Sequence, residues 1–429
     1  MRTIYKEIST EKLYRSLPEK KYKIIDIRQV EIYNGWKPNN EVRGGHIPGA
    51  KSLPYKWAKY IDWIEIVRSK AILPDQSLVI YGSNKEEIEK VANTFTRAGY
   101  PDIQVYLHFF DEWVTNTKMP LDHLKNYHQL VYPEWLQTLI SGDKPTEYTN
   151  NDFVICHAHY RNPEDYHIGH IPGAIELNTL GLESHETWNR RSPGELRKTL
   201  LKHGITSNTS VILYGRFSLP NNDDPFPGSS AGHLGAIRCA FIMMYAGVKD
   251  VRVLNGGIRS WEDEGYELSR KETLAQPAGN FGTEIPARPE LAVDIPEAKE
   301  LLKSPNGDLV SVRSWPEFIG EVSGYNYIEK KGRIPGAIFG NCGTDAYHME
   351  NYRNLDHTTR EYQEIEEIWK EADITPDKHI AFYCGTGWRG SEAFFNAFLM
   401  GWPKVSVFDG GWFEWSNDPE NPTETGIPS

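Results

Sequence analysis

"GHIPGA" at Gly45–Ala50 is repeated at Gly169–Ala174, and the similar "GRIPGA" stands at Gly332–Ala337. A motif that returns along a chain is the signature of a protein built from repeated structural units. Other landmarks recur with this motif, and they recur in the same order each time. We therefore predict that the chain consists of three related domains that arose by triplication.

Two further landmarks follow each copy of the motif. The first is an apolar run that reads as a strand and ends in tyrosine: "LVIYG" to Gly82, "VILYG" to Gly215 and "IAFYC" to Cys384. The second is an apolar pair and a tryptophan in one nine-residue register: "VYLHFFDEW", "VLNGGIRSW" and "VFDGGWFEW". The shared order and register favour one fold for all three copies.

Short β-rich runs alternate with helical stretches between these landmarks. In Ser391–Met400, for example, two alanines and two phenylalanines share one face of a helix. Alternation of strands and helices predicts an α/β fold, with a parallel sheet flanked by helices in each domain. We place the domains at residues 1–120, 126–272 and 284–429. The polar stretch at 271–290, "KETLAQPAGNFGTEIPARPE", reads as the linker between the second and the third.

Composition excludes several classes of function. The chain has 429 residues, of which 39% are hydrophobic and 25% charged, and its net charge is -12. An acidic balance argues against nucleic acid as a partner, because binding there depends on clustered lysine and arginine. No apolar stretch reaches the length of a membrane span. We expect a monomer in the cytoplasm, or in the periplasm if a signal peptide was removed before this numbering begins.

The four cysteines are widely spaced and form no C-x-x-C pair. Neither a zinc site nor a disulfide scaffold is therefore indicated, and we expect no metal and no organic cofactor. Cys156 and Cys239 lie in apolar runs and read as core residues. Cys342, in "NCGTDAY", is expected to be buried or incidental, with a resolving role toward Cys384 as the alternative.

The stretch "CGTGWR" from Cys384 to Arg389 lies between a predicted strand and a predicted helix. Gly385 and Gly387 lack a Cβ, so this loop can curl and turn its amide groups inward. Such a nest at a helix N-terminus forms a cup of partial positive charge, to which Arg389 adds a full charge. This setting favours the thiolate of Cys384, which is the nucleophilic form.

"GHIPGA", a loop that opens with cysteine after a strand, and "GGWFEW" together resemble the rhodanese sulfurtransferase family. The resemblance covers nearly the whole chain, as three tandem rhodanese-like domains. It implies that Cys384 attacks the outer sulfur of thiosulfate or a related anionic donor, releases sulfite and carries a persulfide. A thiophilic acceptor then takes this sulfur.

The resemblance also implies roles for the neighbours of Cys384. The backbone of Gly385, Thr386, Gly387 and Trp388 would cradle the sulfur, and Arg389 would bind the sulfonate of the donor. Arg313 stands where the family places an arginine that faces the substrate.

The chain departs from the family pattern at several places. Ser311 replaces the aspartate two residues before Arg313, and Arg333 replaces the histidine of the third motif. Gly82 and Gly215 occupy the cysteine position, so the first two domains are expected to be inactive. Domain 2 also carries a long insertion at 216–233, which we expect to cover the site in domain 3 or to meet a partner.

Loop length favours sulfur transfer over phosphatase chemistry. Four residues separate Cys384 from Arg389, whereas the related phosphatases have five. A loop that ends in a cation favours a doubly charged inorganic donor over mercaptopyruvate, while polysulfide and a protein persulfide stay open as donors. The alternative hypothesis is a non-catalytic scaffold that recruits a protein sulfur donor or acceptor, such as a cysteine desulfurase.

Overall fold

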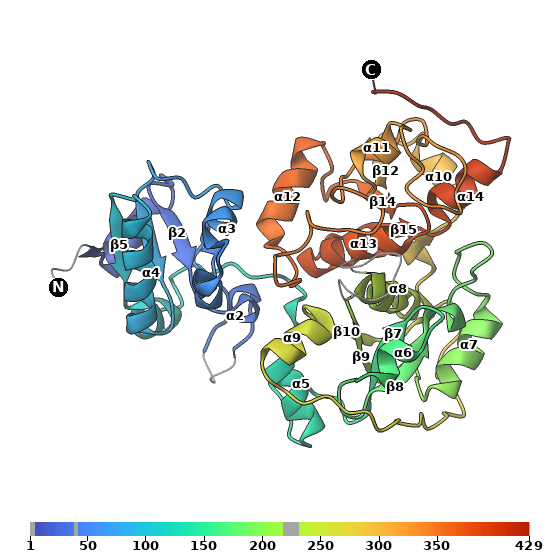
Figure 1. Cartoon of the computed structure of the whole chain (residues 1–429), viewed down its shortest axis with the longest axis horizontal. Helices are drawn as coiled ribbons and strands as arrows, with labels where there is room; N and C mark the ends of the chain where they lie inside the picture. Colours follow the sequence, from blue (N-terminus) through green and yellow to red (C-terminus); the bar gives the residue numbers. More distant parts are fainter. Residues whose placement is uncertain (1–4, 38–41, 218–230, 429) are drawn as a thin grey trace. The chain divides into compact units, whose positions relative to one another are not determined.

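The computed structural model describes residues 5–37, 42–217 and 231–428. Most of the predicted insertion of domain 2, residues 218–230, lies outside the described residues. The chain forms two compact units, residues 1–128 and residues 129–429. The first unit contains domain 1, and the second contains domains 2 and 3 (Figure 1).

Each domain is built on a five-stranded sheet in which every pair of neighbouring strands is parallel. The strand orders are β1-β5-β4-β2-β3, β6-β10-β9-β7-β8 and β11-β15-β14-β12-β13, which is one topology used three times. The predicted α/β fold with three parallel sheets is confirmed. The domain boundaries at single-residue precision stay a prediction.

The strands of domain 1 are β1 (Lys6–Glu7), β2 (Lys23–Asp26), β3 (Lys51–Ser52), β4 (Leu78–Tyr81) and β5 (Ile103–Tyr106). Those of domain 2 are β6 (Leu130–Val131), β7 (Phe153–His159), β8 (Ile175–Asn178), β9 (Ser210–Gly215) and β10 (Asp250–Leu254). Those of domain 3 are β11 (Ala292–Val293), β12 (Gly307–Ser311), β13 (Ile338–Phe339), β14 (His379–Tyr383) and β15 (Val405–Phe408).

The helices of domain 1 are α1 (Thr10–Ser16), α2 (Val30–Asn34), α3 (Trp63–Ser69) and α4 (Lys85–Arg97). Those of domain 2 are α5 (Pro133–Ile140), α6 (Glu164–His167), α7 (Pro193–Lys202), α8 (Ala231–Ala246) and α9 (Gly257–Asp263). Those of domain 3 are α10 (Ile295–Leu301), α11 (Trp315–Phe318), α12 (Tyr362–Glu371), α13 (Trp388–Met400) and α14 (Gly411–Asn417).

The strand that precedes Cys384 lies inside its sheet. β14 pairs with β12 on one side and with β15 on the other. Four of its five residues are buried, as expected for a parallel strand covered on both faces. Ligands bind outside the carboxyl ends of such strands, and the loop that begins with Cys384 is therefore at the functional edge of the sheet.

The helix after this loop begins earlier than the sequence indicated. α13 starts at Trp388 rather than Ser391, with Gly387 as its N-cap at φ +84°. Trp388 and Arg389 therefore belong to the first helical turn and not to a flexible loop.

The first two sequence landmarks contact each other in domains 1 and 2. The amide of the isoleucine in "GHIPGA" hydrogen-bonds the hydroxyl of the buried tyrosine near the end of the central strand. The pairs are Ile47–Tyr81 at 3.0 Å and Ile171–Tyr214 at 2.8 Å. The repeated motif is thus a structural clamp between the sheet and the loop beside it.

A buried arginine holds the same motif in each of the three domains. It donates to the carbonyl of the first glycine of the motif, and the pairs are Arg28–Gly45 at 2.7 Å, Arg216–Gly169 at 2.6 Å and Arg313–Gly332 at 2.7 Å. Because domains 1 and 2 have no cysteine at the active position, this arginine serves the fold.

Domains 2 and 3 pack through a pair of helices. Figure 1 shows α13 lying against α8, where the rings of Phe241 and Phe394 meet edge to face at 5.4 Å. The linker also belongs to this body, because Phe281 is fully buried and its carbonyl accepts a hydrogen bond from the Ser207 amide.

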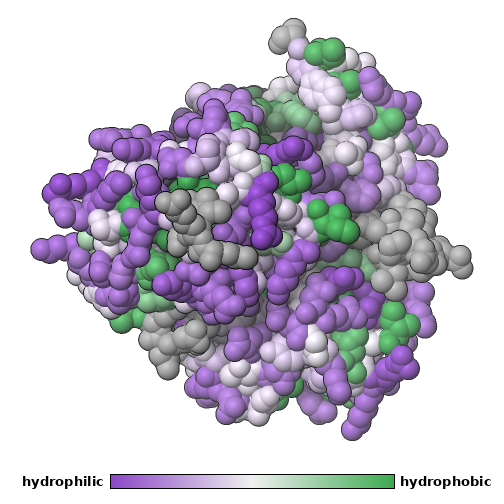
Figure 2. All heavy atoms as spheres, turned by 60° about the vertical axis from the view of Figure 1, so that its left-hand side comes forward, coloured by the Kyte–Doolittle hydropathy of each residue, from purple (hydrophilic) through white to green (hydrophobic). Residues whose placement is uncertain are grey.

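On the face drawn in Figure 2 the surface is mainly hydrophilic, and the hydrophobic residues there form small separate patches. Within residues 5–37, 42–217 and 231–428, no helix combines the length and apolar character needed to cross a bilayer.

The glycines that replace cysteine in domains 1 and 2 leave no space for a thiol. A Cβ on Gly82 would lie 2.5 Å from Cγ1 of Ile27, and a Cβ on Gly215 would lie 2.0 Å from the backbone oxygen of Gly232. The second neighbour is main chain and cannot move aside as a side chain does. Restoring the cysteine therefore requires the backbone to shift.

We expect Gly215→Cys to lower the melting temperature, because overpacking at a closed site costs about 1–3 kcal/mol. It should also carry no additional persulfide after treatment with a sulfur donor. Gly194→Cys in α7 is the matched control, because no atom lies within 4 Å of a Cβ added there. A Gly215→Cys protein as stable as the control, with a second persulfide by intact mass, would show that this position accommodates a working thiol.

Candidate active site around Cys384

The loop from Cys384 to Gly387 is held from behind by the helix that follows β15. The amide of Trp412 donates to the carbonyl of Cys384 at 2.8 Å, and the amide of Phe413 donates to the carbonyl of Gly385 at 2.9 Å. The N-terminus of α14 thus takes up the carbonyl groups of the loop. The amide groups of the same peptides, those of Gly385 and Thr386, take no part in these two hydrogen bonds.

Other parts of the chain approach Gly385 and Gly387 so closely that neither position has room for a Cβ. A Cβ on Gly385 would lie 2.2 Å from Cε2 of Tyr325. Gly387 has a φ of +84°, and a Cβ there would lie 2.6 Å from the backbone oxygen of Asp409. The predicted curl of the loop is therefore present, with one residue in the left-handed region.

The amide groups of residues 385–389 have no hydrogen-bond acceptor within the part of the chain that the structure describes. They lie at and before the N-terminus of α13, where the helix dipole adds partial positive charge. Unpaired amides at a helix N-terminus bind anions. The arrangement supports the predicted cup for a sulfur anion on Cys384.

Two tyrosines lie near the sulfur. The Cys384 side chain is fully buried, and Tyr325 and Tyr327 both interact electrostatically with it. Tyr327 also hydrogen-bonds the side chain of Thr386. These phenol groups therefore belong to the surroundings of the predicted cup.

Arg389 is already paired with a carboxylate. Its Nη1 donates to Oε2 of Glu317 at 2.9 Å and its Nη2 to Oε1 at 2.8 Å, so the pair is bidentate. Nη2 also donates to the Tyr325 hydroxyl at 2.9 Å, and Nη1 to Sγ of Cys342 at 3.1 Å. Only 1% of the arginine is exposed. These contacts give Arg389 a structural role, and binding of a donor sulfonate by it stays a prediction.

Arg313 has a similar setting. It is fully buried, and it bonds Gly332 and Glu317, the latter with 3.3 Å between Nε and Oε1. Glu317 replaces the missing aspartate at Ser311 as the partner of this arginine. Arg28 follows the corresponding strand of domain 1 and bonds the first glycine of the motif there in the same way, so this position serves the fold, and contact between Arg313 and a substrate stays a prediction.

Glu317 was not predicted as a site residue. Burial alone would raise its pKa, but Arg389 and Arg313 outweigh burial and lower the pKa to about 2. The sequence carried one signal for it: Ser314 and Glu317 in "SWPE" have capping-box spacing, and this box is formed at the start of α11. That spacing predicts the start of a helix but does not indicate that Glu317 pairs with a distant arginine.

Cys342 lies behind Arg389 and is fully buried. Burial raises the pKa of its thiol to about 12, although Arg389 opposes the shift. A thiol that stays protonated at neutral pH is a poor nucleophile. The burial of Cys342 agrees with the prediction of a buried thiol. Its raised pKa does not support a resolving role toward Cys384.

An aromatic belt from both domains lines the approach to the loop. Its six rings follow one another at centroid distances of 5.2–5.8 Å, in the order Tyr347, Tyr325, Tyr327, Trp188, Tyr160 and Trp388. Tyr160 and Trp188 come from domain 2, and 42% of Tyr327 is exposed. Domain 2 therefore contributes to the surroundings of Cys384 through these rings.

The repeated fold has counterparts among known proteins. A sequence model described as "Rhodanese-like domain" matches residues 9–116, 150–264 and 294–418. The chain belongs to the rhodanese family. Each matched segment lies within one of the three predicted domains, and Cys384 lies in the third.

Two relatives, one of them in two structures, show which members of the family this chain is similar to. The chain is 40% identical to thiosulfate sulfurtransferase YnjE of Escherichia coli, over 96% of this chain and 90% of the relative. It is 61% identical to EanB in a structure with a cysteine persulfide, in a tetrahedral intermediate state with ergothioneine (TM-score 0.95, covering 98% and 100% of the two chains). It is also 61% identical to EanB, with that cysteine replaced by serine, in complex with hercynine (TM-score 0.96, covering 99% of each).

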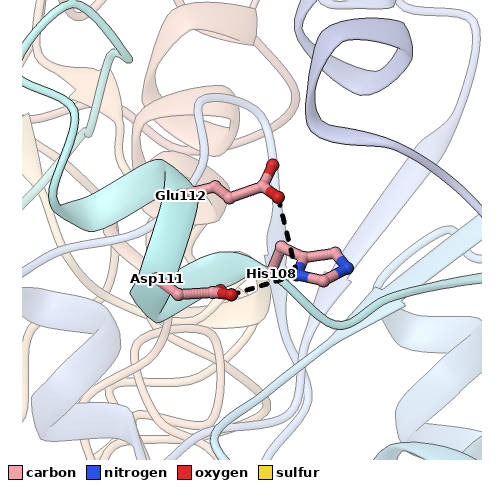
Figure 3. A group of neighbouring side chains, drawn as sticks. All are labelled: His108, Asp111 and Glu112. Carbon is pink, nitrogen blue, oxygen red and sulfur yellow. Dashed lines mark hydrogen bonds and ion pairs between the residues drawn. The ribbon is translucent and has the colours of Figure 1, made fainter.

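A separate group of titratable residues lies in domain 1. In Figure 3 the carboxylates of Asp111 and Glu112 both approach Nδ1 of His108, at 3.1 and 3.6 Å. The group is accessible to solvent, and a hydrogen bond to Asp111 raises the pKa of His108. The two carboxylates outnumber the one imidazole, so the group keeps a negative charge even when His108 is protonated.

Glu317→Gln should destabilise the protein by about 3–5 kcal/mol, because it leaves two buried arginines without their carboxylate. The pKa of Glu317 is about 2 in the folded chain against an ordinary value of 4.5. Its stabilisation is therefore fully present above about pH 4.5 and is lost as the pH falls toward 2. Urea unfolding at several pH values measures this difference between variant and wild type.

Glu300→Gln is the control for this experiment, since Glu300 is exposed and pairs with exposed Lys303 in the same domain. A Glu317→Gln protein as stable as this control at pH 7 would show that the buried pair contributes nothing.

Proposed function

We propose that this rhodanese carries a sulfane sulfur on Cys384 and transfers it to the imidazole ring of a histidine betaine such as hercynine. The family membership supports sulfur transfer. The choice of acceptor is supported by the similarity to EanB and, within this chain, by the aromatic belt. The belt is the observation on which the choice depends most.

The aromatic belt suits a quaternary ammonium group. Such cations bind against the faces of tyrosine and tryptophan, which carry negative electrostatic potential. Of the three successive belt rings Tyr325, Tyr327 and Trp188, Tyr327 is the exposed one, and it stacks on the buried Trp188, so we assign the cation to the Tyr327 end of the belt. A trimethylammonium group held there places the rest of a small betaine beside the sulfur.

The residues named by the EanB structures have counterparts here. EanB variants were studied at a tyrosine 59 residues before the persulfide cysteine and at a threonine two residues after it. Tyr325 and Thr386 have the same spacings to Cys384. Both lie at the cup, since Tyr325 packs on Gly385 and Thr386 bonds Tyr327.

The transfer balances without an external oxidant. A donor first gives its sulfane sulfur to the Cys384 thiolate, which forms an S–S bond. The ring carbon between the two imidazole nitrogens then loses its proton and forms a C–S bond to the outer sulfur, while the S–S bond breaks. Cys384 leaves as a thiolate, the carbon is oxidised by two electrons, and the sulfur is reduced to a thione.

Tyr325 is placed to assist this step. Burial, with Cys384 adding to the effect, raises the pKa of Tyr325 although Arg389 opposes the shift, so the phenol keeps its proton. The hydroxyl oxygen already accepts from Arg389, which leaves its O–H to donate. A ring nitrogen of the acceptor is a suitable partner while charge develops on the imidazole.

Thiosulfate is retained as a donor in this proposal, on the strength of the similarity to YnjE. The pairing of Arg389 with Glu317 removes the free cation that favoured a dianionic donor. Polysulfide or a protein persulfide, delivered by an enzyme such as a cysteine desulfurase, is therefore proposed alongside it.

The first test combines intact mass with product analysis. Wild type treated with polysulfide or thiosulfate should gain one sulfur atom, and Cys384→Ser should gain none. Addition of hercynine should discharge the persulfide and yield one equivalent of ergothioneine. If the persulfide is stable to hercynine but is discharged rapidly by cyanide, the acceptor assigned here is wrong and a thiosulfate:cyanide activity is indicated.

Tyr325→Phe should still form the persulfide but pass sulfur to hercynine about a hundredfold more slowly, because a positioned acid contributes about 10²–10⁴ to such steps. Single-turnover rates from the isolated persulfide measure this effect. Tyr362→Phe, at the start of α12 and outside the aromatic belt, is the control. Equal rates for both variants would exclude a role for the Tyr325 hydroxyl.

A further inference from the structure

We infer that Glu183 of domain 2 is a positioning residue for the loop that carries the persulfide in domain 3. It acts through Trp388, the first residue of α13, and is itself held by Arg238. The inference rests on the proposed persulfide at Cys384 and is independent of the acceptor.

Domain 2 holds Trp388 on three sides. Oε1 and Oε2 of Glu183 each lie 3.0 Å from the indole Nε1, which donates to them. The indole also lies on Gly235 of α8, where an added Cβ would be 3.4 Å from two ring carbons. The ring of Tyr160 meets it edge to face at 5.7 Å. The glycine inside α8 thus provides room for a side chain from another domain.

Arg238 ties this contact to the rest of the loop. Its Nε donates to Oε2 of Glu183 at 3.0 Å, and its Nη2 is 2.5 Å from Oδ1 of Asp409. Asp409 comes directly after β15, and its backbone oxygen lies against Gly387 of the loop. All three charged side chains are fully buried.

A second arginine of domain 2 secures the same aspartate. The amide and Nη1 of Arg190 both donate to Oδ2 of Asp409 at 2.8 Å, and the guanidinium also pairs with Asp294. Because buried charges are tolerated only when they are paired, these partners fix one another's positions. The first turn of α13, which presents its amides to Cys384, is fixed with them.

This network gives domain 2, which has Gly215 in place of the loop cysteine, a role in positioning the loop of domain 3. Misplacement of a reacting group by about 1 Å can cost about a hundredfold in rate. Loss of the Glu183 contact frees Trp388, and with it the amides of the loop, while Cys384 itself is unchanged.

Glu183→Gln and Trp388→Phe test the inference, singly and together. Glu183→Gln keeps the shape but loses the charge that pairs with Arg238, and Trp388→Phe keeps a ring but loses the N–H. We expect each to slow persulfide formation, and discharge to cyanide, at least tenfold with a donor KM within twofold of wild type. The double variant should be no slower than the slower single variant.

Glu176→Gln is the matched control, since Glu176 is a carboxylate of domain 2 that pairs with His159. Its rates should equal those of wild type. Folding is checked by circular dichroism, and if Glu183→Gln does not fold, Trp388→Phe decides alone because it leaves every charge in place.

Wild-type rates in a folded Glu183→Gln protein, or losses that add fully in the double variant, would overturn the inference. Cyanide as the acceptor separates this result from the proposed function. A wild type that loads and discharges to cyanide but does not convert hercynine contradicts the proposed acceptor alone.

Discussion

The ion pair between Arg389 and Glu317 is the interaction on which the site depends. It is buried and bidentate, and it joins the first turn of the helix after Cys384 to the start of α11. The same guanidinium orients Tyr325 and lies against Cys342. Because its charge is paired, the arginine acts on the shape of the cup. The unpaired amides of residues 385–389 are then the groups that attract a sulfur anion.

The three domains repeat a fold and divide its tasks. A buried arginine bonds the first glycine of the motif in each domain, and in domains 1 and 2 the motif isoleucine also bonds the strand tyrosine, so these contacts stabilise the fold. Gly82 and Gly215 are packed too closely to be replaced by cysteine without a shift of their surroundings, which is consistent with the prediction that only domain 3 is catalytic. Domain 2 contributes instead the aromatic surface of Tyr160 and Trp188 and the carboxylate that holds Trp388.

Much of the fold could be predicted from the sequence, because repeated motifs indicate repeated domains and short hydrophobic patterns indicate strands and helices. The triplication, the parallel sheets, and the position of Cys384 after a central strand all follow from short motifs. Contacts between distant segments leave no such pattern. Glu317 looks like an ordinary capping residue, nothing marks Tyr325, and Glu183 lies about two hundred residues from the indole that it binds. Arg389 was read as a free cation because its partner could not be seen.

The central claim is that the amides of the loop, and not a free arginine, hold the sulfur that Cys384 carries. A high-resolution crystal structure of the persulfide form tests it most directly. The account predicts an outer sulfur within about 3.5 Å of several amide nitrogens of residues 385–389, with Arg389 still paired to Glu317. An outer sulfur bound by a guanidinium released from Glu317, with those amides turned away, would contradict it.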